Sequence, residues 1–226
     1  MKAVLFDMDG VLVDVSGSYR RAIAATVEHF SGATVSAGEI QAYKDAGGCN
    51  NDWELTRLLL HDRGVEVPLE EVVSVFQELY LGQNFDGLIN NERWLLRAEV
   101  AERLAGRYAL GVVTGRPRRE ALWTLQRAGM QHFFGAVVTM DDLPRDRQKP
   151  HPDGLRLALA ALGAEGGWYV GDNVDDIIAA RGANVAPIAV LANQAGEEGA
   201  ARAALLRRYG AVAVIPDVNS IEEVLR

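Results

Sequence analysis

Short apolar runs alternate with longer amphipathic stretches along most of the chain. Several of the runs are apolar throughout, which is typical of strands that are covered on both faces of a sheet. Six runs predict strands: Ala3–Phe6, Tyr108–Val113, Ala136–Thr139, Trp168–Val170, Pro187–Leu191 and Val212–Ile215. Helical spacing between them predicts helices over Arg118–Gly129, Pro152–Leu162, Val174–Arg181 and Gly199–Tyr209. This alternation predicts an α/β fold with an open, doubly wound, mostly parallel sheet.

The alternation is interrupted between the first two predicted strands. From residue 16 to about residue 86 no β-like run occurs, and apolar residues at helical spacing predict a helical segment instead. Its expected helices are Tyr19–Phe30, Trp53–His61 and Leu69–Leu81, and a further helix is expected from Glu92 to Ala105. We therefore expect two domains, a core formed by residues 1–14 and 89–226 and a helical insertion formed by residues 15–88.

Composition and charge narrow the class of protein. Of the 226 residues, 49% are apolar, which is enough to form a buried core. The net charge of −8 argues against a nucleic-acid partner, because such proteins present a basic face. The single cysteine, Cys49, fits a reducing compartment and is expected to be an incidental thiol. With no long apolar run and no leader-like N-terminus, we expect a cytoplasmic protein without a membrane partner. No feature of the sequence predicts an oligomeric state.

Polar residues follow each predicted strand that should border the binding crevice. Ligands of open α/β sheets bind outside the carboxyl ends of the strands, so these residues are expected to form one site. They are Asp7 and Asp9 after the first strand, Thr114, Gly115 and Arg116 after the second, Asp141, Asp142 and Lys149 after the third, and Asp172, Asp175 and Asp176 after the fourth.

The chemistry of these side chains favours a divalent cation and a phosphate group. Crowded carboxylates stay ionised only when a cation lies among them. Oxygen ligands such as those of Asp7, Asp172 and a backbone carbonyl suit Mg²⁺, whereas the four scattered histidines offer no zinc site. Lys149 and the cation can hold a phosphate dianion. The Thr114 hydroxyl and the Gly115 amide add donors beside a predicted helix N-terminus.

Four segments carry a resemblance to a known family. FDMDGVLVD resembles the first motif of the haloacid dehalogenase superfamily, and VVTGRP, QKP and VGDNVDD resemble its second, third and fourth motifs, in order. The resemblance spans the whole chain, including a helical cap inserted after the first motif. It implies a Rossmann-like core and a subfamily IA phosphatase of the phosphoglycolate-phosphatase-like group with a C1 cap. Many relatives have asparagine where this chain has Gly115, so the surface facing the leaving group departs from the common pattern.

The resemblance also implies roles for individual residues. Asp7 corresponds to the nucleophile that forms an aspartyl phosphate, and Asp9 to the general acid that later acts as base. Mg²⁺ would be bound by the carboxylates of Asp7 and Asp172 and by the backbone carbonyl of Asp9. Asp176 would support the metal, with Asp175 as the alternative. The remaining expected phosphate contacts are Thr114, Gly115, Arg116 and Lys149, although Arg116 equally fits a role at the start of its helix.

Several alternatives remain open at this point. The leading hypothesis is a Mg²⁺-dependent phosphatase acting on a small phosphorylated metabolite. A β-phosphoglucomutase-like mutase would keep both Asp7 and Asp9. A phosphonatase would use a cap amine such as Lys44, but neither it nor a dehalogenase needs Asp9. The loop from Lys44 to Glu54 either contacts substrate hydroxyls or simply links two helices, with an Asn or Asp capping the second.

Overall fold

The computed structural model describes residues 1–48, 51–192 and 196–225, and its chain divides into two compact units. One unit consists of Met1–Val13 together with Trp94–Arg226, and the other of Asp14–Arg93. From the sequence we placed these divisions after residues 14 and 88. The chain passes between the units in β2 (Val13–Asp14) and β3 (Arg93–Trp94), and these two strands form a small sheet of their own.

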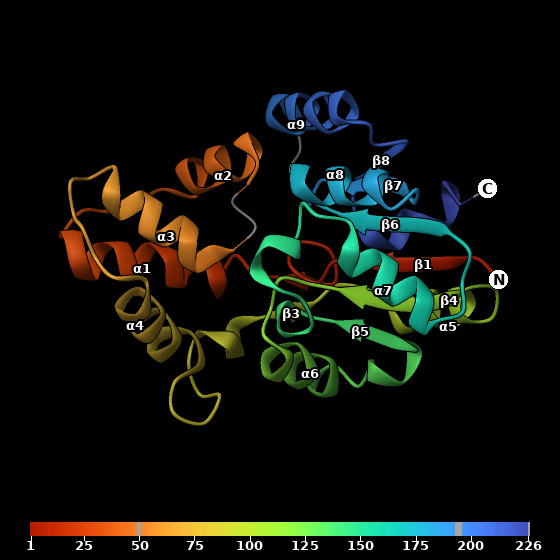
Figure 1. Cartoon of the computed structure of the whole chain (residues 1–226), viewed down its shortest axis with the longest axis horizontal. Coiled ribbons are helices and arrows are strands. Elements are labelled where there is room, and N and C mark those ends of the chain that lie inside the picture. The colour runs from red at the N-terminus through yellow and green to blue at the C-terminus, as the bar shows by residue number, and fades with distance from the viewer. Residues whose placement is uncertain (49–50, 193–195, 226) are drawn as a thin grey trace. The chain divides into compact units, whose positions relative to one another are not determined.

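The larger unit is built on a six-stranded parallel sheet (Figure 1). The strand order is β5–β4–β1–β6–β7–β8. Their bounds are β1 Ala3–Phe6, β4 Ala109–Val113, β5 Ala136–Val138, β6 Gly167–Gly171, β7 Ala186–Val190 and β8 Ala213–Ile215. The predicted fold class is therefore confirmed, because continuous apolar runs form parallel strands that are buried on both faces.

The strand order places the expected site. From β1 the chain continues to β4 and β5 on one side of β1, and then returns to β6 on the other side. This reversal makes β1 the topological switch point of the sheet, the place where α/β proteins bind ligands. The carboxyl ends of β4, β1 and β6 consequently lie side by side.

Helices flank the sheet between consecutive strands. The helices are α5 Ala98–Ala105, α6 Arg118–Arg127, α7 Asp153–Ala161, α8 Val174–Gly182 and α9 Gly196–Tyr209, with short 3₁₀ turns η2 Gln131–Phe133, η3 Met140–Asp142, η4 Arg145–Arg147 and η5 Val218–Glu223. Helix α7 packs across β5, β4 and β1, and α8 packs on β6 and β7. These contacts bury the apolar face of each helix against the sheet.

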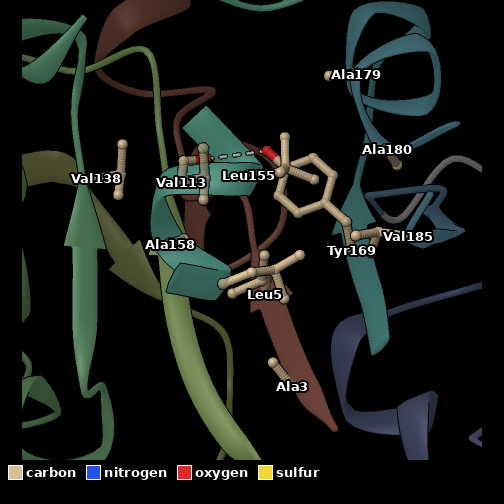
Figure 2. Close-up of a cluster of buried hydrophobic side chains, with 11 residues drawn as sticks. Ala3, Leu5, Val113, Val138, Leu155, Ala158, Tyr169, Ala179, Ala180 and Val185 are labelled. Carbon is tan, nitrogen blue, oxygen red and sulfur yellow. Dashed lines mark hydrogen bonds between the residues drawn. The ribbon is translucent and has the colours of Figure 1, made fainter. Parts of the chain in front are cut away.

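One core cluster reaches from the sheet toward the carboxyl ends of the strands (Figure 2). Leu5, Val113 and Leu155 pack there around the ring of Tyr169. The Tyr169 hydroxyl donates a hydrogen bond to the backbone carbonyl of Val113 at 2.9 Å. A buried phenol needs such a partner, and here the partner lies at the last residue of β4.

The smaller unit is helical apart from its ends in β2 and β3. It contains α1 Tyr19–Ser31, α2 Ala37–Ala46, α3 Asp52–His61, α4 Leu69–Leu81 and the 3₁₀ turn η1 Leu88–Asn91. Its core includes the rings of Tyr19 and Tyr80, whose centroids are 4.1 Å apart. Helix α2 was not expected, because its segment AGEIQAYKDA has few apolar residues at helical spacing. Its first turn is capped by the Ser36 hydroxyl, which accepts from the Glu39 amide.

The helix expected from Glu92 to Ala105 is wrong over its first half. Residues 93–94 form β3, and α5 begins only at Ala98. The backbone between them is held by distant partners, because the Leu95 amide donates to Leu12 and the Arg97 amide donates to the Asn219 side chain. These long-range bonds replace the local bonds that a helix would make.

Candidate active site

The first acidic residues lie where β1 ends. The Asp7 amide donates to the carbonyl of Val170 at 2.8 Å and so extends the pairing of β1 with β6 by one residue. Gly10 then turns the chain with φ = 74°, and a Cβ at this position would lie 2.3 Å from Oδ2 of Asp172. Only glycine permits both the left-handed backbone and this close approach. The loop therefore brings Asp7 and Asp172 to the same small volume.

Lys149 lies among the carboxylates. Its ammonium is 2.8 Å from Oδ1 of Asp7 and 2.8 Å from Oδ1 of Asp176, and it donates to the Tyr169 hydroxyl at 3.0 Å. All of these side chains are buried. A lysine ammonium has three donors, and each has an acceptor here.

The motif at the end of β6 is ordered by the start of α8. Oδ2 of Asp176 accepts from the backbone amides of Asp172 and Asn173, at 3.1 and 3.0 Å. The Asn173 side chain donates to Oδ1 of Asp172 at 2.6 Å. Asp176 thus holds the first turn of the helix while its other oxygen contacts Lys149. Asp175, the alternative that the sequence left open, is buried but is not part of the acidic group described next.

Within the described part of the chain, one group of side chains has the spacing of a metal site. Oxygen atoms of Asp7, Asp172 and Asp176 all lie within 4.8 Å of one another. These ligands are carboxylate oxygens, which suit Mg²⁺. The residues present therefore fit the expected cation.

The electrostatics of the group agree with that fit. Burial raises the pKa of the Asp7 carboxyl well above its usual value, and the nearby carboxylates add to this effect although Lys149 opposes it. Burial also disfavours the charge of Lys149, but Asp176 and Asp7 outweigh it and raise the pKa of its ammonium. Lys149 therefore stays charged, and a divalent cation would further favour the ionised form of Asp7.

Thr114 and Arg116 follow β4, and both are buried. The Arg116 amide donates to the Thr114 hydroxyl at 3.2 Å. The Arg116 guanidinium lies 2.7 Å through Nε and 2.5 Å through Nη2 from Oδ1 of Asp9, and Nη1 donates to the Thr124 hydroxyl at 2.9 Å. The structure thus places this arginine on Asp9. Its contact with phosphate, like that of Gly115, stays a prediction.

Two other acids from the expected set, and Asp14 of the first motif, bond elsewhere. Asp142 caps η3 through Thr139 and forms an ion pair with Arg118, and Asp141 accepts from the Arg118 amide at 2.7 Å. Asp14 accepts from the Ser16 hydroxyl at 2.6 Å and from the Arg93 guanidinium at 2.8 Å. These residues order the loops around the site and are not in the acidic group.

The loop from Lys44 to Glu54 is described except for Cys49 and Asn50, which lie outside the described residues. Asn51 caps α3, because its side-chain oxygen accepts from the amides of Trp53 and Glu54. The Lys44 ammonium is 2.8 Å from Oδ1 of Asp52. The capping role that the sequence offered is therefore present in this loop.

Sequence reasoning missed three residues that contact the acidic group or its turn: Tyr169, Asn173 and Arg202. Tyr169 was recognisable as a polar group inside a continuous apolar strand, and Asn173 as an N-cap residue. Arg202 gave no comparable signal. It lies far from every motif, in a segment that also contains Arg207 and Arg208, so the sequence does not distinguish it from an exposed arginine.

Comparison with known proteins assigns the family. A family model described as haloacid dehalogenase-like hydrolase matches residues 1–184. The chain belongs to this family. This match confirms the resemblance that the four motifs of the hydrolase carry.

Curated relatives of the hydrolase carry several names. An imidazoleglycerol-phosphate dehydratase of Phytophthora nicotianae is 40% identical over 203 residues, which are 86% of this chain but 44% of that protein. The hydrolase therefore spans less than half of that relative. The pyrophosphatase PpaX of Bacillus pumilus is 26% identical over 88% of this chain and 87% of its own length. Phosphoglycolate phosphatase 1 of Pseudomonas aeruginosa is 26% identical over 81% of this chain and 67% of its own length.

Solved structures support the fold of the hydrolase. A putative β-phosphoglucomutase from Thermotoga maritima aligns over 100% of both chains with a TM-score of 0.67 and 24% identity. This likeness confirms the predicted fold class. The family match, together with the relatives named as phosphatases, confirms the predicted family and enzyme class, a phosphatase-type hydrolase. None of the helices in the described residues has the length and apolar character needed to cross a membrane.

Proposed function

We propose that this hydrolase is a Mg²⁺-dependent phosphatase that cleaves a small phosphomonoester through an aspartyl phosphate on Asp7. The observation that carries the proposal is the buried group in which Lys149 joins Asp7 to Asp176, 2.8 Å from each, with Asp172 within reach of one cation. A carboxylate held beside an ammonium and a cation can approach a phosphate dianion without prohibitive repulsion.

In the first step an oxygen of Asp7 attacks phosphorus, and the bond from phosphorus to the leaving oxygen breaks. Asp9 gives its proton to that oxygen, so the alcohol leaves neutral. In the second step Asp9 takes a proton from the water that attacks the phosphorus atom of the aspartyl phosphate. The bond between phosphorus and Asp7 then breaks, which regenerates the carboxylate and releases phosphate.

The other residues bind and orient the reacting groups. Thr114 and Lys149 would hold the oxygens of the transferring phosphoryl group, and Arg116 would hold Asp9 in position. Asp7, Asp172 and the Asp9 carbonyl would bind Mg²⁺, with Asp176 in support. When bound, the cation supplies positive charge that offsets the negative charge of the phosphoryl group.

Substrate choice and location are part of the same proposal. The helical unit of residues 14–93 would act as a cap that excludes water and selects a small metabolite. The names of the relatives suggest four compounds to test: phosphoglycolate, pyrophosphate, a sugar phosphate and a phosphomonoester that carries an imidazole ring. We further propose a cytoplasmic enzyme without nucleic-acid or membrane partners, which agrees with its negative charge and single cysteine.

The experiment is a measurement of inorganic phosphate released from this panel, with Mg²⁺ and then with excess EDTA. We expect release from at least one of the phosphomonoesters in Mg²⁺, loss in EDTA, and loss in the D7N variant. Phosphate release that persists in D7N would overturn the proposal. If no inorganic phosphate is released, but a phosphoryl group is transferred between sugar hydroxyls when a sugar bisphosphate is present, the enzyme is instead the mutase.

A further inference from the structure

Arg202 is a buried arginine that the proposed reaction does not use. It lies in α9, one turn before Leu206, so both side chains share one face of the helix. Leu206 packs in a core cluster with Val174 and Ile177 of α8 and Ala189 of β7. This packing fixes α9 against α8, and Arg202 is 5% exposed as a result. A charge buried this far from water must be paired or hydrogen bonded.

The guanidinium reaches the turn that carries Asp172. Its Nη2 donates to the backbone carbonyl of Asp172 and lies 3.3 Å from the side-chain oxygen of Asn173. Because that oxygen of Asn173 faces Arg202, the amide nitrogen faces Oδ1 of Asp172, to which it donates at 2.6 Å. Arg202 therefore holds the main chain of Asp172 directly. Together with the Asp176 amide, which donates to the same side chain of Asn173, it also orients the Asn173 amide that contacts the Asp172 carboxylate.

The second carboxylate oxygen of Asp172 faces Gly10 of the first motif. A Cβ on Gly10 would lie 2.3 Å from Oδ2, so this oxygen lies against the loop that begins with Asp7. Asp172 is one of the three carboxylates that share the candidate cation site.

We propose that Arg202 is a positioning residue for the divalent cation site. It acts by orienting Asp172 directly and through Asn173. The proposal rests on the proposed function, because it assumes a cation bound at this group. It goes beyond the family match, which covers residues 1–184 and does not reach α9.

Charge alone predicts the opposite effect. A buried guanidinium repels a divalent cation, so its removal would tighten binding if electrostatic repulsion dominated. Loss of an outer-shell partner that orients a ligand typically weakens metal binding about 10-fold to 100-fold. The direction of the change therefore separates positioning from repulsion.

The test is the affinity for Mg²⁺, measured by isothermal titration calorimetry on the full chain after metal has been stripped. We compare wild type, R202M, R202K and the control R207M, which changes an exposed arginine of the same helix. We expect about 10-fold weaker binding in R202M, an intermediate loss in R202K and no change in R207M. Circular dichroism and melting in EDTA show whether each variant folds. The Mg²⁺ concentration for half-activation should rise in R202M, while KM at saturating Mg²⁺ stays as in wild type.

Two results would overturn the inference. One is Mg²⁺ affinity in folded R202M that equals or exceeds that of R207M. If R202M does not fold, the second result is an affinity of R202K for Mg²⁺ that equals that of wild type. Failure of wild type to bind any divalent cation would instead remove the proposed function, and the inference with it. Binding by wild type with no change in the variants removes the inference alone.

Discussion

Replacing Arg116 with methionine tests whether this arginine acts through Asp9. The substitution keeps an unbranched apolar chain of similar length in the buried site and removes the two nitrogens that contact Oδ1 of Asp9. It also removes the donor to Thr124. The Arg116 side chain is 0% exposed and that of Asp9 is 24% exposed, so water can replace only part of what Asp9 loses.

The magnitude follows from the kind of contact that is lost. Removing one partner from a fully buried ion pair costs about 3–5 kcal/mol, and a single hydrogen bond to a charged group is worth about 1.5–3 kcal/mol. Because Asp9 is partly exposed, we take about 2 kcal/mol for holding its carboxylate. Such a loss in the transition state lowers kcat about 30-fold. KM should change little, because the guanidinium faces Asp9 and Thr124.

The assay is a steady-state measurement of kcat and KM at saturating Mg²⁺ on the best substrate of the panel. R118M is the matched control, because Arg118 lies two residues further along, at the start of α6, but pairs with Asp142 outside the acidic group. We expect its kcat to stay within about twofold of wild type, as for most surface changes. A double-mutant cycle with D9N completes the test, since residues that act as a unit are not additive.

If Arg116 acts through Asp9, R116M should lower kcat much less in the D9N background than in wild type. The reasoning is refuted if the two losses multiply, or if R116M alone keeps the kcat of R118M. A rise in KM with unchanged kcat would show instead that Arg116 contacts phosphate.

Three further changes probe the same group. D7N should lower kcat at least about a thousandfold, because it removes the proposed nucleophile. D14N lies in the same motif, but Asp14 bonds to Ser16 and Arg93 outside the acidic group, so kcat should stay within about tenfold. Equal losses in the two variants would argue against a special role for Asp7. Y169F removes the hydroxyl shared by Lys149, Asp176 and the core, so chemical denaturation should show a loss of about 1–3 kcal/mol in unfolding free energy, and an unchanged midpoint would contradict this. G10A forces a Cβ against Asp172 at positive φ and should cost at least about 1 kcal/mol, together with weaker Mg²⁺ binding in calorimetry; a variant as stable as wild type would show that the loop relaxes freely.

The strands and the first contacts of the site were predictable from the sequence. Ala3–Phe6 is a continuous apolar run, and a parallel strand buried on both faces produces that pattern. Because ligands bind at the carboxyl ends of such strands, Asp7 and Asp172 could be placed together although 165 positions separate them in the sequence.

What the sequence did not reveal depends on distant packing. The backbone at residues 95–97 leaves a helical pattern because Leu12 and Asn219 bond it, and neither residue is near it in sequence. The role of Arg202 was missed for the same reason, because only the packing of α9 on α8 brings its side chain to Asn173. Arg116 was predicted in part. Its position in the second motif was evident from the sequence, but its pairing with Asp9 was not.

The register of β1 against β6 has a consequence for how this enzyme can diverge. Phe6 pairs with Val170, and the amide of Asp7 continues that ladder into the site. A slip of one residue would turn Asp7 to the other face of the sheet, so the main-chain ladder itself protects the spacing between the proposed nucleophile and the acids that follow β6. Substitutions in the helical unit do not enter this ladder. The proposed chemistry is thus tied to the sheet, whereas the substrate choice that we propose for the helical unit can change during evolution through residues that the sheet does not constrain.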